Sequence, residues 1–249
     1  MSIYVIGDLH LPFGVNKPMD IFGDGWQDYT QKIKEDWNKK VKKEDTVIIA
    51  GDFSWATYLE ETYKDFEYLC ALPGNKIMLK GNHDYWWTTV TSMKKYLKEN
   101  KFNNIDFLYN NSFLIENKII VGTRGWALLD TENSNKMVKR EAARLELSLK
   151  SAIENYGKEK EIICIMHYPP VIASYMKDGN IYNSEFLEVM KKYNVKKCYY
   201  GHLHGASHKD AVEGIVEGIE LKLISGDYLK FKLEKMSIIF ENVLKIFIY

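Results

Sequence analysis

Residues 46–52 read TVIIAGD, an apolar run that ends in Gly51 and Asp52. Short runs that are rich in Val and Ile and lack polar alternation are typical of strands buried on both faces. The same arrangement, an apolar run followed by residues that can bind metal, occurs four more times along the chain. These runs are 3–6, 76–79, 161–166 and 197–200, and a further run, 118–121, precedes Arg124.

Segments of helical period separate these runs. Ile33, Trp37 and Val41 recur at steps of four, which places them on one face of a helix. Strands that alternate with helices predict βαβ units and a largely parallel sheet. Similar apolar stripes are formed by Tyr63, Phe66 and Cys70, and by Val138, Ala142, Leu145, Leu149 and Ile153.

The pattern changes after about residue 205. Ile215, Ile219, Leu221 and the stretch 228–233 show period-two alternation, which predicts antiparallel hairpins. We expect the tail, residues 237–249, to form a final strand or a docked helix. The length of 249 residues and the absence of a linker or repeat predict a single domain over residues 1–249.

Composition excludes several classes of protein. The 34 basic and 34 acidic residues balance, so there is no general basic surface for extended nucleic acid. No apolar run reaches the roughly 18 residues that cross a membrane. The chain enters a strand at once, without the basic flank and apolar core of an export signal. Cys70, Cys164 and Cys198 are widely spaced, which indicates free, buried thiols and a cytoplasmic protein.

The polar residues after the strands form a candidate metal site. Ligands in open α/β sheets bind beyond the carboxyl ends of the strands, so residues at five strand ends can converge. Five of the six histidines occur in these motifs, whereas isolated histidines usually belong to the core or the surface. Carboxylate, amide and imidazole ligands suit Mn²⁺, Fe, Zn²⁺ or Co²⁺. The candidate ligands are Asp8, His10, Asp52, Asn82, His167, His202 and His204.

The order of the motifs resembles that of the calcineurin-like metallophosphoesterase superfamily. The motifs are Asp8-Leu9-His10, Gly51-Asp52, Gly81-Asn82-His83-Asp84, His167 and Gly201-His202-Leu203-His204, and they span residues 8–204. The resemblance implies two packed mixed β-sheets flanked by helices, a four-layer αββα sandwich. It also implies a site for two divalent metal ions at one end of the sandwich.

The resemblance implies a role for each motif residue. A metal-bound water or hydroxide would attack phosphorus, and His83 would protonate the leaving group or stabilise the charge that develops. Asp84 would orient the His83 ring. The implied ligands are Asp8, His10 and His204 for one ion and Asn82, His167 and His202 for the other, with Asp52 bridging the two.

Two departures from the family pattern narrow the class. Purple acid phosphatases have a ligating tyrosine where this chain has Trp55, and an indole offers no lone pair to a metal. The Ser/Thr protein phosphatases have an arginine shortly after the position of Asp52 and a glutamate in place of Asp84. This chain has neither that arginine nor that glutamate, which tells against a phosphoprotein substrate. Trp55 in place of the ligating tyrosine tells against a coloured iron site.

Three further residues are candidates for substrate binding. Arg124 follows a strand, where a guanidinium can grip a phosphate, although a surface ion pair explains it equally well. Trp55 and Trp86 lie close to Asp52 and Asp84, and Trp87 and Trp126 are also near motif residues. These rings could line a pocket for a flat group, although packing over the sheet edge is the simpler interpretation.

The sequence therefore predicts a metal-dependent phosphoesterase that hydrolyses a small soluble phosphate ester. The alternatives within enzymes are a cyclic-nucleotide phosphodiesterase and a nuclease, since these share the core motifs. An alternative of another class is a non-catalytic metal-binding scaffold. Such a relative would be expected to lose His83 or several ligands, and this chain keeps them all. The pattern predicts no oligomeric state.

Overall fold

The computed structural model describes residues 1–19, 21, 23–173, 176–177, 180–181 and 184–236. Within these residues the chain forms two large sheets and one small strand pair. The first sheet has the order β13-β1-β2-β3-β4, and the second has the order β11-β12-β10-β7-β6-β5. The small pair consists of β8 (Met176–Lys177) and β9 (Asn180–Ile181).

The first sheet is parallel except at one edge. Strands β1 to β4 run parallel to one another, and β13 pairs with β1 in the opposite direction. Three helices, α1 to α3, connect its strands. The bounds are β1 (Ile3–Ile6), α1 (Tyr29–Lys40), β2 (Thr46–Ile49), α2 (Tyr63–Ala71), β3 (Asn75–Met78), α3 (Val90–Glu99), β4 (Ile105–Phe107) and β13 (Glu234–Lys235).

The second sheet has four parallel central strands and an antiparallel strand at each edge. Helices α4 and α5 connect its central strands. The bounds are β5 (Phe113–Ile115), β6 (Lys118–Thr123), α4 (Glu132–Tyr156), β7 (Glu161–Met166), α5 (Glu185–Lys192), β10 (Lys197–Tyr200), β11 (Gly214–Val216) and β12 (Ile219–Leu223). Short 3₁₀ segments are η2 (Asp24–Trp26), η3 (Leu59–Thr62) and η5 (Gly205–Asp210).

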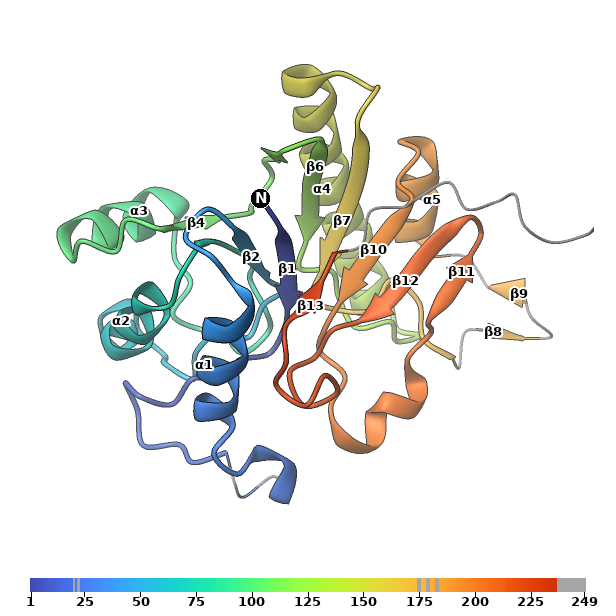
Figure 1. The fold of residues 1–249 in the computed structure, drawn as a ribbon. Helices are drawn as coiled ribbons and strands as arrows, with labels where there is room; N and C mark the ends of the chain where they lie inside the picture. The colour runs from blue at the N-terminus through green and yellow to red at the C-terminus, as the bar shows by residue number, and fades with distance from the viewer. Residues whose placement is uncertain (20, 22, 174–175, 178–179, 182–183, 237–249) are drawn as a thin grey trace, which may run out of the picture.

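The alternation of side chains along each strand divides the apolar residues among three cores. In β2, Val47 and Ile49 pack with α1 to α3, whereas Ile48 packs between the two sheets. In β7, Ile163 and Ile165 face the same central core, and their neighbours pack with α4 and α5. The result is the predicted four-layer αββα sandwich, with helices on the two outer faces (Figure 1).

Helix α1 shows how the helical period places a helix against its sheet. Tyr29, Ile33 and Trp37 are buried on one face, and the Trp37 indole nitrogen donates a hydrogen bond to the Pro73 carbonyl at 2.9 Å. The helix ends at Lys40 because Val41 adopts an extended backbone, so Val41 packs beyond the helix rather than within it.

The predicted strands and helices agree with the structure, with one error. Residues 228–233 form a turn rather than a strand, and Lys230 and Phe231 have positive φ angles of 53° and 59°. The Phe231 N–H bonds back to the Gly226 carbonyl at 2.6 Å, so no partner strand is needed. The prediction for residues 237–249 lies outside the described residues.

Two of the three cysteine thiols are buried, as the sequence predicts. Cys164 and Cys198 are free and buried in neighbouring strands, whereas Cys70 is free and half-buried. None of the described helices is both long and apolar enough to span a bilayer.

Candidate metal centre

The carboxyl ends of the parallel strands bring all seven predicted ligands together. Asp8 follows β1, Asp52 follows β2 and Asn82 follows β3 in the first sheet. His167 follows β7, and the His202-Leu203-His204 segment follows β10 in the second sheet. The site therefore lies where the two sheets meet at one end of the sandwich, as predicted.

Asp8, His10 and His204 form one group of possible ligands. The Nε2 atom of His204 lies 3.4 Å from Asp8 Oδ1 and 3.4 Å from His10 Nε2. One atom from each residue lies within 4.8 Å of the others, a spacing that can hold one cation. Asp8 and His10 are buried, and His204 is half-buried.

Asn82, His167 and His202 form the second group. The Asn82 Oδ1 atom lies 2.6 Å from His167 Nε2 and 2.8 Å from His202 Nδ1. Asp52 lies between the two groups, since its Oδ2 atom is 3.7 Å from His10 Nε2 and 3.6 Å from His167 Nε2. This position is the one that a bridging carboxylate would occupy.

The backbone at the strand ends turns sharply to aim these side chains. Asp8, His10, Asp52 and His202 have φ angles of 59°, 44°, 50° and 74°, in the left-handed region that L residues rarely adopt. Residues two apart in an extended segment point to the same side, so the spacing of Asp8 and His10 predicts a shared face of an extended stretch. The positive φ angles of both residues show that the segment is not regularly extended, so that prediction is wrong.

The same turns explain why His202 and His204 do not lie side by side. His202 has a positive φ angle and faces Asn82, whereas His204 has an extended backbone and faces Asp8. Their spacing of two residues predicts that both side chains share one face of an extended segment, and the structure shows that this prediction is wrong. They contribute instead to the two different ligand groups.

Gly81 lets the β3 and β2 loops approach each other. A Cβ atom on Gly81 would lie 2.0 Å from Asp52 Oδ1 and 2.2 Å from the Asp52 nitrogen. Gly51 has a φ angle of 88°, and a Cβ atom there would lie 2.7 Å from the Gly81 Cα atom. Two glycines facing each other thus permit the short distance between Asp52 and the Asn82 loop.

Electrostatics at the centre favour a bound cation. Burial, with Asp84 and Asp8 nearby, raises the pKa of Asp52 well above its ordinary value. The Nδ1 atom of His10 is buried and has no hydrogen-bond partner among the described residues. Crowded carboxylates and imidazoles of this kind are stabilised when a cation supplies the missing positive charge. The residues present therefore fit divalent metal ions.

The rings of His167 and His204 are oriented by partners behind them. His167 Nδ1 lies 3.0 Å from the Ala50 carbonyl, to which it can donate. His204 Nδ1 lies 2.8 Å from Asp227 Oδ1. Both contacts leave Nε2 facing the centre, as expected where a second group fixes the tautomer of a ligand. Burial alone would lower the pKa of His204, but Asp8 and Asp227 raise it to about 10.

Asp84 bonds differently from what the sequence predicts. Its carboxylate accepts the backbone N–H groups of Gly81, Asp52 and Phe53 at 2.7–2.9 Å and the Trp86 indole N–H at 3.0 Å. Among the described residues no hydrogen bond joins Asp84 to the His83 ring. Asp84 therefore holds the Asp52 turn against the Gly81 loop, and none of its described hydrogen bonds reaches the His83 ring that the resemblance assigns to it.

His83 lies beside the ligands without joining either group. Its backbone N–H donates to Asp52 Oδ1 at 2.8 Å, which fixes the residue next to the bridging position. The half-buried ring faces Trp55, with ring centroids 4.7 Å apart, and His10, with centroids 5.7 Å apart. Burial, with His167 and Lys17 nearby, lowers the pKa of His83 below its ordinary value.

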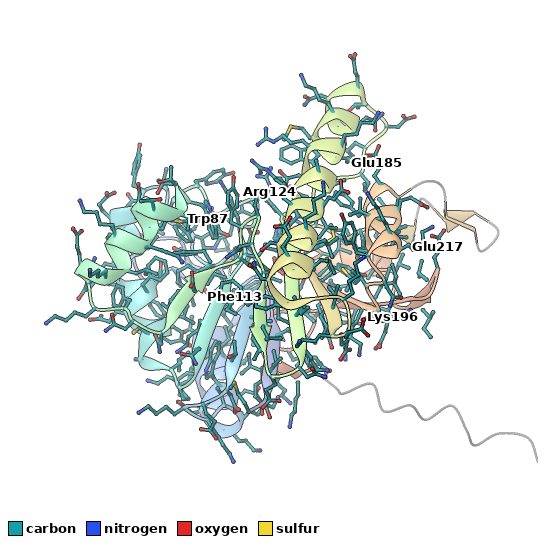
Figure 2. The ribbon with its side chains drawn as sticks, turned by 90° about the horizontal axis from the view of Figure 1, so that it is seen from above. Trp87, Phe113, Arg124, Glu185, Lys196 and Glu217 are labelled. Carbon is teal, nitrogen blue, oxygen red and sulfur yellow. The ribbon has the colours of Figure 1, made fainter. Side chains whose placement is uncertain are left out.

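Of the three candidate substrate-binding residues, two are held by other contacts. Trp86 is fully buried and packs against Phe53 and Phe66, so its ring is held within the core. Arg124 lies beside α4 (Figure 2), with its guanidinium 3.9 Å from Glu141 Oε1 and its Cζ atom 4.6 Å from the centre of the Trp126 ring. Trp55 alone lines a cavity next to His83.

The sequence interpretation missed Asp227, Trp26 and Met19. Asp227 contacts His204, and the other two line the cavity beside His83. A signal for Asp227 was present, because the alternating strand-like segment 219–224 is followed by Gly226-Asp227, much as the apolar run 46–50 is followed by Gly51-Asp52. Met19 lies in an irregular segment before α1 and Trp26 ends the short 3₁₀ segment η2, where no period indicates their positions.

Comparison with known proteins identifies the class of the fold. A model of the family described as calcineurin-like phosphoesterase matches residues 1–206, most of the chain. No protein in a curated collection matches the sequence significantly.

Several solved structures share the fold at low sequence identity. A protein of unknown function from Aquifex aeolicus is 20% identical, with a TM-score of 0.51 over 94% of this chain and 95% of that one. A phosphopantetheinyl hydrolase from Mycobacterium tuberculosis is 13% identical, with a TM-score of 0.53 over 94% and 95%. A protein from Thermus thermophilus is 15% identical, with a TM-score of 0.57 over 95% and 99%. At these identities the likeness concerns the fold alone.

Proposed function

The chain belongs to the calcineurin-like phosphoesterase family, and from this premise we propose that it hydrolyses a small phosphate ester with two divalent metal ions. The observation that carries the proposal is the convergence of seven metal-binding side chains with His83 at one end of the sandwich. Asp52, between the two groups, lies within 3.7 Å of one histidine from each.

The proposed metal ions have a defined part in the reaction. When bound, two divalent ions would polarise the phosphate ester and supply a nucleophile at neutral pH. Asp8, His10 and His204 would hold one ion, and Asn82, His167 and His202 would hold the other. The set contains oxygen and nitrogen donors without thiolate, which suits Mn²⁺, Fe, Zn²⁺ or Co²⁺.

Asp52 would be the bridging ligand. Two features support this role: its position between the ligand groups and the hydrogen bonds that hold it there. Its N–H bonds to Asp84 Oδ2 at 2.9 Å, and its Oδ1 atom accepts the His83 N–H at 2.8 Å. The Oδ2 atom is left to face both groups. Because its loop is fixed in this way, the carboxylate is oriented before any ion or substrate binds.

His83 would act on the leaving group. Its ring lines a cavity next to the ligands, where the oxygen of a departing alcohol can reach it. Because burial lowers its pKa, the ring favours the neutral form at pH 7, which can donate one hydrogen bond to the leaving oxygen. A positioned hydrogen-bond donor that stabilises developing charge in this way contributes roughly 10²- to 10³-fold to the rate.

Two variants test the proposal. We expect His83→Ala to keep both ions and to lose about 10²- to 10³-fold in kcat. We expect Asp52→Ala to lose affinity at both ion positions, because its carboxylate faces both groups. Metal content is measured by elemental analysis of the purified protein. Activity is measured with Mn²⁺ on 4-nitrophenyl phosphate and on the matching methyl 4-nitrophenyl diester.

The outcomes separate the roles. Loss of metal from His83→Ala would show that His83 is a ligand. Full metal content and full activity in Asp52→Ala would remove the bridging assignment. A strong preference for the diester would favour a phosphodiesterase. Hydrolysis of neither ester by protein that holds both ions would refute the general esterase function proposed here.

A further inference from the structure

A cavity of about 320 Å³ lies beside the candidate metal centre. His10, His83 and His204 form the side that adjoins the ligands, and Met19, Trp26 and Trp55 form the rest of its side-chain lining. Cavities that bind small molecules are commonly of this size and are lined mainly by apolar and aromatic residues. The cavity therefore adjoins His83, the residue proposed to act on the leaving group.

The aromatic side of the cavity is held in place by packing. The Trp55 ring stacks on His10 with centroids 4.5 Å apart and an interplanar angle of 22°. Its indole nitrogen lies 2.8 Å from the Met19 sulfur. Trp26 packs against Phe231, with centroids 5.0 Å apart, and is almost fully buried. These contacts fix the cavity before a ligand enters it.

The chemistry of the lining indicates the kind of group that would bind. Apart from the three histidines, the side chains that line the cavity are two indoles and a thioether. A lining without carboxylate or amide side chains lacks the groups that usually pair with the edge of a nucleobase. Lys17 Nζ lies 3.4 Å from the centre of the Trp55 ring. The nearby carboxylates of Asp8 and Asp227 contact His204 without forming part of the lining. Such a surface favours an uncharged, flat, apolar group.

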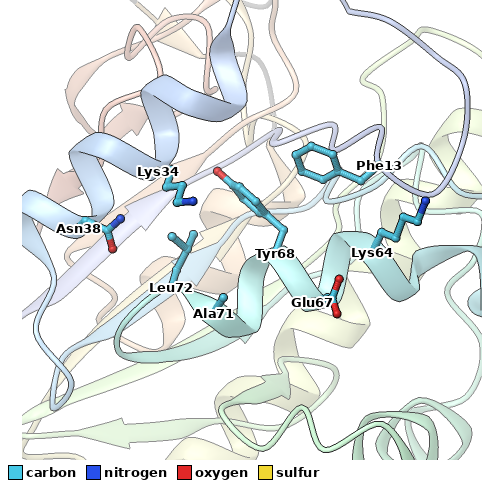
Figure 3. A pocket seen from close by; sticks show the side chains of 8 residues that line it. All are labelled: Phe13, Lys34, Asn38, Lys64, Glu67, Tyr68, Ala71 and Leu72. Atoms are coloured by element: carbon cyan, nitrogen blue, oxygen red, sulfur yellow. The ribbon is translucent and has the colours of Figure 1, made fainter.

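Three further cavities of the described residues do not adjoin the candidate ligands or His83, and one of them, of about 550 Å³, is lined by residues that include Lys150 and Tyr193. The cavity at Arg124 holds about 20 Å³, close to the space that one water molecule needs. A cavity of about 360 Å³ lies between α1 and α2 (Figure 3), but its lining, which includes Phe13, Lys34 and Tyr68, contains no candidate ligand and not His83. A group attached to the scissile phosphate would thus be bound beside Trp26 and Trp55.

We propose that the cavity between Met19, Trp26 and Trp55 binds the organic part of the substrate, and that the substrate is a phosphate ester of an alcohol that carries an aromatic ring. The inference rests on the proposed phosphoesterase function. The size agrees, because an apolar cavity of about 150 Å³ binds benzene, and this one is about 320 Å³. One ring with a short chain to the phosphate fits this volume.

The test compares two esters that differ only in the apolar group. Ethyl phosphate and 2-phenylethyl phosphate both release a primary alcohol, so their intrinsic reactivity is similar. If the enzyme prefers diesters, the methyl diesters of the same two alcohols replace them. We expect kcat/KM to be about 10- to 100-fold higher for the phenylethyl ester, the gain from burying a side chain of that size.

Variants locate the preference in the cavity. Trp26→Ala removes one side of the cavity and should reduce the ratio of the two kcat/KM values toward one. Met19→Trp should reduce the same ratio by filling the cavity, and it leaves Trp26 in its packing position. Trp126→Ala is the matched control, because Trp126 packs on Arg124 and Tyr168 and does not line the cavity. This control should keep the ratio of the wild-type protein.

A binding measurement decides the matter independently of activity. Saturation-transfer NMR should detect 2-phenylethanol bound to the wild-type protein but not to Met19→Trp, with ethanol as the unbound control. Equal kcat/KM values for the two esters would overturn the inference and leave the esterase proposal standing. If neither ester is cleaved, binding of 2-phenylethanol that Met19→Trp abolishes would support the cavity, whereas no binding would overturn it together with the esterase proposal.

Discussion

Replacing Asp227 tests how the residue behind His204 affects metal binding. Asp227 Oδ1 lies 2.8 Å from His204 Nδ1, and Oδ2 accepts the Gly205 N–H at 3.0 Å. A hydrogen bond that involves a charged group contributes about 1.5–3 kcal/mol, which corresponds to about 10- to 100-fold in affinity. We therefore expect Asp227→Ala to weaken binding of one ion by that factor, as found for groups that orient metal ligands.

Two further variants separate charge from shape. Asp227→Asn keeps the size of the side chain but offers one acceptor oxygen instead of two, so either His204 or Gly205 loses its partner. We expect a smaller loss, about tenfold, from this variant. The control is Asp210→Asn, at the end of η5, the segment that begins just after His204. No contact joins Asp210 to His204 among the described residues, so this variant should bind both ions normally.

The loss should also depend on pH. His204 must release a proton to bind a metal, and Asp8 and Asp227 raise its pKa to about 10 against the effect of burial. Protons therefore compete with the ion more strongly in the wild-type protein than in Asp227→Ala, whose His204 has a lower pKa. It follows that the difference in affinity between the two proteins should widen as the pH rises from 6 to 9.

Chelator competition with Mn²⁺ at several pH values measures the affinity, and circular dichroism checks that each variant is folded. The ion at Asn82, His167 and His202 serves as an internal reference, because Asp227 contacts only the other group of ligands. Wild-type affinity for both ions in folded Asp227→Ala would refute the reasoning. Equal weakening at both positions would refute the assignment of His204 to a single group.

Three further predictions concern stability. Burial raises the pKa of Asp65 from 3.8 to about 7, so the unfolded chain loses this proton first as the pH rises and stability falls between about pH 4 and pH 7. Urea unfolding should show that the free energy of unfolding of the wild-type protein falls by about 2 kcal/mol from pH 5 to pH 7 relative to that of Asp65→Asn. The same pH dependence in both proteins would contradict this prediction. Gly81→Ala would place Cβ 2.0 Å from Asp52 Oδ1, so we expect a Tm several degrees lower and loss of metal, whereas Gly25→Ala, with open space around it, should melt like wild type. Adding Mn²⁺ to chelator-treated protein should raise Tm, because an ion at 100 times its Kd adds about 2.7 kcal/mol to the free energy of unfolding. An unchanged Tm would argue against an ion site in the folded state.

The central strands were predictable because they are buried on both faces. Burial of this kind favours apolar residues on both faces, which gives an uninterrupted run after the first residue of β7, Glu161, and of β10, Lys197. The edge strand β5 and the edge strand β4 have three residues each and include exposed or half-buried positions. Such short, mixed stretches carry too little pattern to be recognised.

The error at residues 228–233 has a specific cause. Phe231 and Leu233 are buried and Lys232 is exposed, so the alternation in the sequence reports a real alternation in burial. However, the backbone bonds locally, from Leu229 to Ser225 and from Phe231 to Gly226. Period-two alternation of apolar residues indicates which side chains face the core, but it does not establish that the backbone pairs with another strand.

The candidate ligands could be named from the sequence because metal binding restricts the residue types and the fold restricts their places. The residues that support them obey neither restriction. Asp84 directly follows His83, yet its carboxylate turns away to bond with the Asp52 loop, and Asp227 reaches His204 from 23 positions along the chain. Whether a carboxylate serves its neighbour in sequence or a distant loop depends on the direction of its side chain. That direction depends on how the loops that carry Asp84 and Asp227 fold against their neighbours, which only the three-dimensional structure supplies.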